Sequence, residues 1–409
     1  MPAGDATARA RRLVATRRQF LLGGAAAGVG AVAAMGIDRA MRPAADAPVA
    51  QPLHGEETIP FHGVHQAGLD TEPQAHAVFL ALDLLPEVDR DGLRRLMRIL
   101  SDDASRLTRG LPPLADTEPE LAVTPARLTV TFGFGPGLVS RVGGRAPEWL
   151  APLPAFGIDR LRPEFSDGDL LLQVAADDQV TVAHAVRMLL KDARSFARLR
   201  WSQRGFRRAH GSERSGTTMR NLFGQVDGTS NPVPGTPEFE RAVWSNEGWM
   251  AGGTGLVLRR IHMDLDGWDR LDRSGRDQAL GRFQSNGAPL TSSSEGARAE
   301  FDEPDLAAKS AVGFPLIPAF SHVRRSRGEE VIFRRAYNYD ESPVGAEVSD
   351  SGLLFVSLQA DVAAQLVPIQ RRLDELDLLN EWTTPVGSAV FAMPPGCEEG
   401  GFIGETLLV

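Results

Sequence analysis

Cysteine, lysine and tyrosine are scarce in this chain of 409 residues. Cys397 is the single cysteine, so the chain can form neither an internal disulfide nor a cysteine-rich zinc or iron–sulfur site. Lysine occurs only at Lys191 and Lys309. The fold must therefore be held by burial of its hydrophobic residues, whose share of 42% is ordinary for a globular protein.

Basic residues are also fewer than acidic residues, 44 against 53. The formal net charge is −9, and residues 1–46 hold seven of the arginines and three of the acidic residues. The remainder has 44 − 7 = 37 basic and 53 − 3 = 50 acidic residues, a net charge of −13. This argues against nucleic acid as the main partner and against attachment to an anionic membrane, since both need a positive face.

The first 47 residues have the layout of a twin-arginine signal peptide. Arg17 and Arg18 precede residues 20–37, which carry no charge and are rich in glycine and alanine, and residues 45–47 form an A-x-A cleavage site. An uncleaved membrane anchor is the alternative, because the run is nearly long enough to span a bilayer. Weak hydrophobicity and the cleavage site favour export by the twin-arginine translocase. We expect a periplasmic, cell-envelope or extracellular protein with no stable membrane span after cleavage.

Hydrophobic periodicity in the remaining chain predicts an α+β fold of two similar halves. Residues 48–57 read as a linker, residues 58–215 as the N-terminal half and residues 216–409 as the C-terminal half. Alternating apolar residues predict strands, and apolar residues at helical spacing predict helices on one face of each sheet. The pattern matches two ferredoxin-like halves with antiparallel sheets. The predicted strands are 75–84, 127–134, 170–175, 255–260, 331–337 and 352–359, and the helical segments are 89–109, 180–198, 267–278 and 361–379.

Three positions in the second half could carry chemistry. Asp227 lies in the segment GQVDG at 224–228, which in isolation reads as an ordinary turn because Asp-Gly is a common turn pair. His322 follows an apolar segment flanked by prolines, which can present it to an apolar pocket. Arg334 and Arg335 end a predicted strand, where adjacent side chains face opposite sides, so that one of the two can point inward.

The wider sequence resembles the dye-decolorizing peroxidases, and within them an exported bacterial branch close to the deferrochelatases. The resemblance runs along nearly the whole chain after residue 47. It rests on the blocks HQAG (65–68), FGFGPGL (132–138), GQVDGTSNP (224–232), LRRIHM (258–263), GAPL (287–290), SHVRR (321–325), RRAYNY (334–339), GLLFVSLQ (352–359) and PVGSAVFAMPPG (385–396).

This resemblance implies the dimeric α+β-barrel fold, one haem b per chain and a site in the C-terminal half. It implies His322 as the proximal ligand of the iron, Asp227 as the distal acid–base residue and Arg334 as the distal cation. The enzyme would reduce hydrogen peroxide and oxidise a dye-like, phenolic or protein electron donor. The resemblance also allows a homo-oligomer. Further haem contacts are implied for Leu353 and Phe355, which match residues of the distal pocket, and for Arg259 or Arg282 at the propionates.

Several alternatives stay open at this point. Arg335 is the alternative to Arg334, because the segment that follows His322 is shorter than in relatives. The acceptor for the second imidazole nitrogen of His322 is left unassigned, with a carboxylate near Glu398 or Glu399 as a guess. Electrons can reach haem through aromatic residues; the candidates are Tyr337, Tyr339, Trp201, Trp244, Trp249, Trp268 and Trp382.

Two other functions compete with the peroxidase hypothesis. A haem-handling protein, which releases iron from haem in the manner of a deferrochelatase or carries haem, would share the haem ligand but depend little on Asp227. A calcium-binding turn at GQVDG is the non-haem hypothesis, and it lacks the run of acidic ligands that such a site needs.

Overall fold

The computed structural model describes residues 53–294, 296, 298–343 and 349–409. The predicted signal peptide lies outside the described residues, as does the linker up to residue 52. The end of that linker contains a short 3-10 helix, η1 (His54–Glu56). Within the described parts of the chain, no helix is both long and apolar enough to cross a membrane.

The first half is a four-stranded antiparallel sheet with two helices. Its elements in chain order are β1 (His76–Leu84), α3 (Arg90–Leu107), β2 (Thr129–Phe134), β3 (Leu170–Ala176), α5 (Gln179–Ala193) and β4 (Ala197–Phe206), with the short helix α4 (Pro136–Arg141) after β2. The strands pair in the order β2-β3-β1-β4, which is the ferredoxin-like arrangement. Both long helices begin at an aspartate cap: Asp89 accepts from Gly92 N–H and Asp178 from Thr181 N–H.

The second half repeats this order. Its strands β5 (Thr254–Met263), β7 (Tyr337–Glu341), β8 (Asp350–Gln359) and β9 (Thr383–Met393) pair antiparallel as β9-β5-β8-β7. The short strand β6 (Phe333–Arg334) precedes β7 and also pairs with β8. The α-helices of this half are α6 (Pro237–Val243), α7 (Leu265–Asp269), α8 (Arg273–Leu280), α9 (His322–Ser326), α10 (Val367–Leu376) and α11 (Glu405–Leu408).

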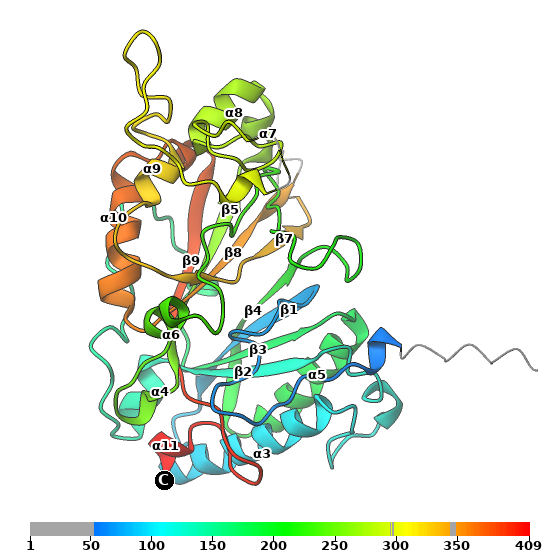
Figure 1. Ribbon diagram of the computed structural model, residues 1–409. Helices are drawn as coiled ribbons and strands as arrows, with labels where there is room; N and C mark the ends of the chain where they lie inside the picture. The colour runs from blue at the N-terminus through cyan, green and yellow to red at the C-terminus, as the bar shows by residue number, and fades with distance from the viewer. Residues whose placement is uncertain (1–52, 295, 297, 344–348) are drawn as a thin grey trace, which may run out of the picture. The chain divides into compact units, whose positions relative to one another are not determined.

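The two sheets join into one barrel-like ring. β4 meets β7 at Phe206 and Asn338, and β2 meets β9 at Phe134 and Ala392, so that eight antiparallel strands close on themselves. The predicted α+β fold of two ferredoxin-like halves is therefore confirmed. Figure 1 shows α3 and α5 beside the strands of the first half, and α10 beside β8 and β9.

Alternate residues of strand β1 point to opposite faces of the sheet and pack into two different buried clusters. Val78, Leu80 and Leu82 pack with the residues of α3 and α5 in one buried cluster. Ala77 and Phe79 point the other way, into a second cluster inside the ring. That inner cluster also contains residues of β5, β8 and β9, so the two halves bury their inner faces against each other.

Four expectations about individual elements were wrong. The helix expected over 180–198 ends at Ala193, where the chain turns into the unpredicted strand β4. β4 was missed because its outward residues are arginine and other polar types, while its inward alternation is short. The strand expected over 331–337 is split into β6 and β7, and the helix expected over 361–379 is a π-helical turn, η6 (Val362–Leu366), followed by α10 and a 3-10 turn, η7 (Leu378–Glu381). The polar segment 267–278 lies across two helices, α7 and α8.

A carboxyl pair between α3 and α5, of which Asp103 is buried and Asp192 half-buried, gives the stability of this fold a pH dependence. Burial raises the pKa of Asp103 from 3.8 to about 8, with further contributions from its hydrogen bond to Asp192 and the charge of that residue. The folded state therefore holds this proton more tightly than the unfolded state, and the contribution to stability is full below pH 3.8 and is lost as the pH rises towards 8.

We predict that Asp103→Asn raises the melting temperature more at pH 8 than at pH 5, because the loss of stability grows as the pH rises above 3.8. A tenfold difference in proton affinity between the folded and unfolded states is worth about 1.4 kcal/mol. The gain in unfolding free energy at pH 8 should be about that size once solvent screening is allowed for. Calorimetric melting between pH 5 and pH 8 measures the effect, with exposed Glu87→Gln as the control. Equal pH dependence in wild type and Asp103→Asn would contradict this explanation.

Candidate active site

A cavity of about 610 Å³ in the second half brings most of the predicted site residues together. It lies between the face of the second sheet that points away from the ring interior and the helices α9 and α10. Six of the seven predicted site residues line it: Asp227, Arg282, His322, Arg334, Leu353 and Phe355. The seventh, Arg259, is not part of the lining.

His322 is the first residue of α9, and its orientation is fixed by a buried carboxylate. The imidazole Nδ1 lies 2.6 Å from Oδ2 of Asp377, whose other oxygen accepts the backbone N–H of Leu379 at 3.0 Å. With its proton at Nδ1, the neutral imidazole presents an unprotonated Nε2 as a metal ligand. The sequence left this partner unassigned, and the guess of Glu398 or Glu399 was wrong: the acceptor is Asp377, which directly follows α10.

The charges around His322 act in opposite directions on its pKa. Burial of the ring lowers the pKa, while the charge of Asp377 and the hydrogen bond to it raise it, and the net shift is upward. Arg334 lowers and Asp227 raises the same pKa, so both of these groups act on the imidazole across the cavity.

Asp227 and Arg334 form an ion pair, with 3.0 Å between Oδ1 and Nη1. The turn that carries Asp227 needs its glycines, because Gly224 and Gly228 have φ values of +77° and +126°. A Cβ on Gly224 would lie 2.8 Å from the amide nitrogen of Gln284. The turn interpretation and the functional interpretation of GQVDG thus describe the same structure: the tight turn directs the carboxylate at the cavity.

The structure separates the two neighbouring arginines. Arg334 lines the cavity, whereas Arg335 is buried on the other side of the strand and donates to the Thr71 carbonyl and to Gln74 Oε1. Asn231 holds the backbone of Arg334 on both sides: it donates to the carbonyl at 2.7 Å and accepts the N–H at 3.1 Å. Sequence analysis gave Asn231 no role, although it lies in the GQVDGTSNP block.

The remaining arginines near the cavity differ in their surroundings. Arg282 lines the cavity and donates to the carbonyls of Gly287 and Glu300, each at 2.7 Å. Its burial, together with the nearby Arg327 and Arg334, lowers its pKa. Arg327 also lines the cavity, although the sequence patterns gave it no function. Arg259, by contrast, is buried in an ion pair with Asp159.

These residues suit a haem. A free imidazole nitrogen can bind iron, and the walls from β5 and β8 are apolar, with Ile261, Met263, Leu353 and Phe355. Arg282 and Arg327 offer positive charge at the same cavity for carboxylate groups. The volume also lies in the range of cofactor pockets, roughly 300–1,000 Å³.

Most of the candidate relay aromatics are buried rather than exposed: Tyr337, Tyr339, Trp201, Trp244 and Trp268. Half-buried Trp382 meets Trp268 edge-on, with 5.3 Å between ring centroids. Trp268 stacks on Phe223 at 4.4 Å, and Phe223 lines the cavity. An aromatic path therefore leads from a partly exposed tryptophan to the site.

Comparison with known proteins gives one consistent result. The family described as Dyp-type peroxidase, N-terminal, matches residues 66–207, and its C-terminal counterpart matches residues 218–398. A dye-decolorizing peroxidase of Thermobifida fusca is 37% identical, with 96% of this chain and 97% of that protein covered. A deferrochelatase of Yersinia pestis is 33% identical, with 85% and 84% covered.

Solved structures agree with this result. A DyP-type peroxidase from Cellulomonas bogoriensis is 54% identical with a TM-score of 0.84, over 87% of this chain and 99% of that one. Ferric DtpA from Streptomyces lividans is 40% identical with a TM-score of 0.83, over 88% of this chain and 100% of that one.

We predict that Asp377→Asn weakens haem retention or activity by about 10–100-fold, because the carboxylate orients the imidazole and makes Nε2 a better ligand. Haem content and haem dissociation rates, measured by absorbance, report the change. Glu375→Gln on the same helix is the control, because Glu375 is exposed and pairs with Arg325. Equal haem dissociation from Asp377→Asn and wild type would show that the hydrogen bond is dispensable.

Proposed function

This chain belongs to the Dyp-type peroxidase family, and on that premise we propose that it binds one haem b through His322 and uses Asp227 and Arg334 to reduce hydrogen peroxide. Family membership makes it a dye-decolorizing peroxidase, an enzyme with a peroxide oxidant and an electron-donating substrate. The observation that supports the residue roles is the arrangement of one cavity: a carboxylate-held imidazole together with an Asp–Arg ion pair.

When bound, haem supplies the iron at which the peroxide O–O bond is cleaved. Asp227 has an acceptor oxygen for the peroxide proton and can return that proton to the oxygen that leaves as water. Arg334 pairs with Asp227 before the transfer and stabilises the negative charge on the leaving oxygen. Asn231 fixes the backbone of Arg334, so the guanidinium needs little reorganisation during the step.

We predict that Asp227→Asn slows the reaction with peroxide by about 10²–10⁴-fold, since it removes the acid–base group. Arg334→Leu should cost about 10²–10³-fold, as for other groups that stabilise developing charge. Stopped-flow absorbance after mixing haem-loaded protein with one equivalent of peroxide measures both. Haem content serves as the control for binding. Rates equal to wild type in both variants would rule out the proposed roles.

The relatives named deferrochelatases make iron release from haem the second candidate function. The peroxidase is favoured because the distal Asp–Arg pair has a direct use in O–O cleavage and none in removing iron from haem. Iron released from haem, measured with a ferrous chelator in the presence and absence of reductant, separates the two. Release that is independent of Asp227, together with slow peroxide turnover, would favour the second candidate.

We also propose that bulky donors deliver electrons through Trp382 and Trp268. Support comes from the ring contacts that link these residues with Phe223 at the cavity. Trp382→Phe should slow oxidation of a bulky anthraquinone dye severalfold and leave the reaction with peroxide unchanged. Steady-state dye assays and stopped-flow mixing test the two halves of this prediction. The control is Trp249→Phe, because Trp249 stacks on Phe134 and is not part of this path. An equal loss of dye oxidation in the two variants would exclude a specific path through Trp382.

We propose export by the twin-arginine route, which carries folded proteins and so suits a chain that acquires haem before transport. The support is the pair Arg17-Arg18 ahead of an uncharged run. Replacing both with lysine should leave the protein in the cytoplasm with residues 1–47 attached. Cell fractionation and N-terminal sequencing provide the measurement, and unchanged export of the double variant would overturn the assignment.

A further inference from the structure

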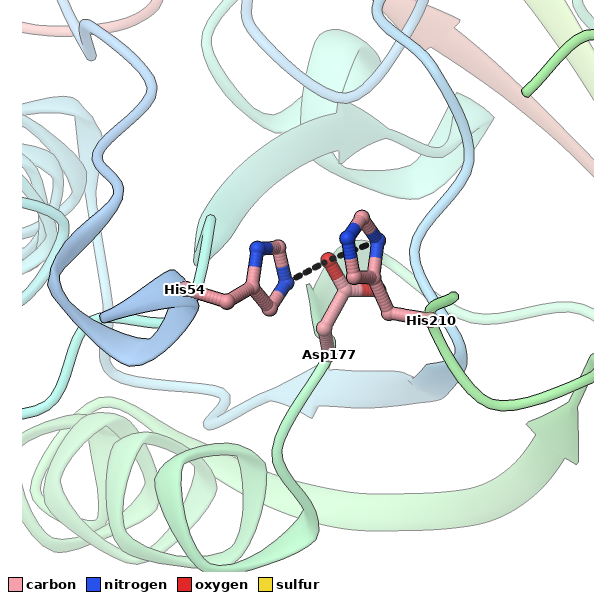
Figure 2. A group of neighbouring side chains, drawn as sticks. All are labelled: His54, Asp177 and His210. Carbon is pink, nitrogen blue, oxygen red and sulfur yellow. Dashed lines mark hydrogen bonds and ion pairs between the residues drawn. The ribbon is translucent and has the colours of Figure 1, made fainter. Parts of the chain in front are cut away.

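A second group of metal-binding side chains lies away from the cavity. His54 comes from η1, Asp177 directly follows β3, and His210 lies in the loop after β4 (Figure 2). One ligand atom from each lies within 4.8 Å of the other two. None of the three lines the active-site cavity, and the proposed function uses none of them.

Both ring nitrogens of His54 face carboxylate oxygens. Nδ1 lies 3.1 Å from Oε1 of Glu57, and Nε2 lies 3.0 Å from Oδ2 of Asp177. A neutral imidazole carries one N–H and can therefore donate to only one of the two. Nε2 makes a hydrogen bond with Asp177 Oδ2, whereas the buried Nδ1 has no hydrogen-bond partner, so His54 has a ring nitrogen that is not committed to the protein.

His210 supplies a second nitrogen at the same oxygen. Its ring stacks on that of His54, with 3.5 Å between centroids and 4° between planes. Its Nδ1 lies 3.9 Å from Oδ2 of Asp177. In a tetrahedral zinc site, bonds of about 2.0–2.1 Å put neighbouring ligand atoms about 3.3 Å apart. The separations of 3.0 and 3.9 Å lie on either side of that value. Because the two rings are nearly parallel, the His210 ring must rotate out of the stack for both nitrogen lone pairs to point at one ion.

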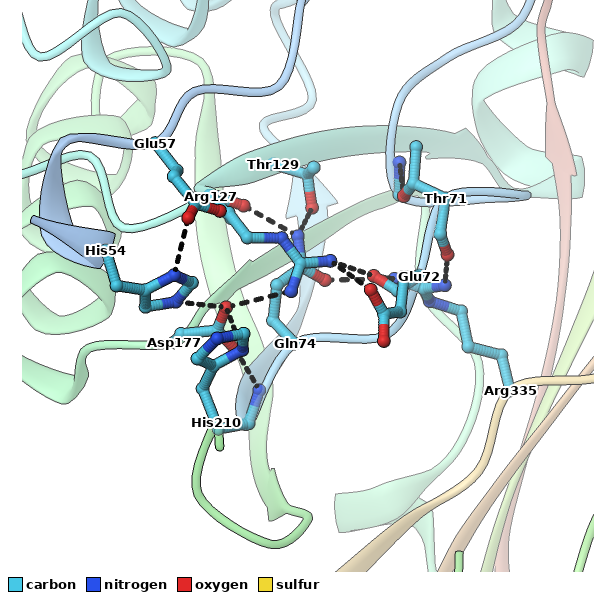
Figure 3. A network of polar contacts seen from close by, with 12 residues as sticks. His54, Glu57, Thr71, Glu72, Gln74, Arg127, Thr129, Asp177, His210 and Arg335 are labelled. Atoms are coloured by element: carbon cyan, nitrogen blue, oxygen red, sulfur yellow. Dashed lines mark hydrogen bonds and ion pairs between the residues drawn. The ribbon is translucent and has the colours of Figure 1, made fainter. Parts of the chain in front are cut away.

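The surrounding contacts hold the carboxylate in place and leave excess negative charge. Asp177 Oδ1 accepts the Ala75 N–H at 2.7 Å, and Oδ2 accepts Arg127 Nη1 at 3.1 Å (Figure 3). Ion pairs link the cluster to Glu57, Glu72 and Arg127. Three carboxylates share these ion pairs with one guanidinium, and the wider network adds Arg335, so negative charge remains for a bound cation to balance when the histidines are neutral.

We propose that His54 Nε2, His210 Nδ1 and Asp177 Oδ2 bind a divalent transition-metal ion of the zinc type, with water as a further ligand. Imidazole nitrogens select zinc-like ions over calcium and magnesium, which prefer oxygen. Glu57 Oε1 lies 3.1 Å from Nδ1, close enough to accept its N–H after a small rotation once Nε2 binds the ion, as carboxylates do for metal-bound histidines. The ion replaces a proton at Nε2 and joins the segment ahead of β1 to the end of β3 and the loop after β4.

Titration calorimetry with zinc tests this proposal on the mature, haem-loaded protein without an affinity tag, after dialysis against a chelator. Wild type should bind one equivalent of zinc that His54→Ala and His210→Ala lose, with affinity at least about tenfold weaker in each. His262→Ala is the matched control, because His262 also pairs with a carboxylate, Asp350, but lies outside the cluster. Calcium chloride in place of zinc should give no binding at this site.

Zinc should also raise the melting temperature of wild type and of His262→Ala but not of His210→Ala. His210 is exposed, so its replacement should leave the fold and the peroxidase activity unchanged. Equal zinc stoichiometry and affinity in His210→Ala and wild type would overturn the proposal. Absence of zinc binding to wild type at millimolar concentration would do the same and leave a proton between His54 and Asp177. Both outcomes are independent of peroxide turnover.

Discussion

Each ferredoxin-like sheet has a second face that its own helices do not cover, and the burial of these faces against each other is the constraint on which the structure depends. Closing the ring through only two strand junctions buries Phe79, Leu256 and Phe391 in one interior cluster. The outward faces are then free to differ. Helices α3 and α5 pack closely on the first, whereas the second sheet and α10 enclose the cavity.

The cavity is functional because its polar groups are held by buried contacts at the ends of elements. Asp377 ends α10 and orients His322 at the start of α9. Across the cavity, Asn231 holds the strand residue Arg334, which pairs with Asp227 on a glycine-dependent turn. Each charged group thus has a partner before any substrate arrives, which is the preorganisation that electrostatic catalysis requires.

Local pattern predicted six of the strands and the long helices, whereas the roles of the motif residues that line the cavity came from the resemblance to the dye-decolorizing peroxidases. The strand alternation predicted that Arg334 and Arg335 point to opposite sides, but only the fold shows that Arg334 is the one that faces the cavity. Asp377 could not be predicted, because it lies 55 residues from His322 and its contact depends on how α10 packs. Strand β4 was missed for a related reason, since its inward residues alternate with arginines that a helix would also tolerate.

The central claim is that His322 holds the haem iron through Nε2 while Asp377 holds Nδ1. The most direct measurement is the electron paramagnetic resonance spectrum of haem-loaded His322→Gly, with and without added imidazole, alongside peroxidase turnover. We expect His322→Gly to have a changed ferric spectrum and no turnover, and added imidazole to restore both. Imidazole should restore them less well in the double variant that also carries Asp377→Asn. An unchanged spectrum and unchanged turnover in His322→Gly would contradict it.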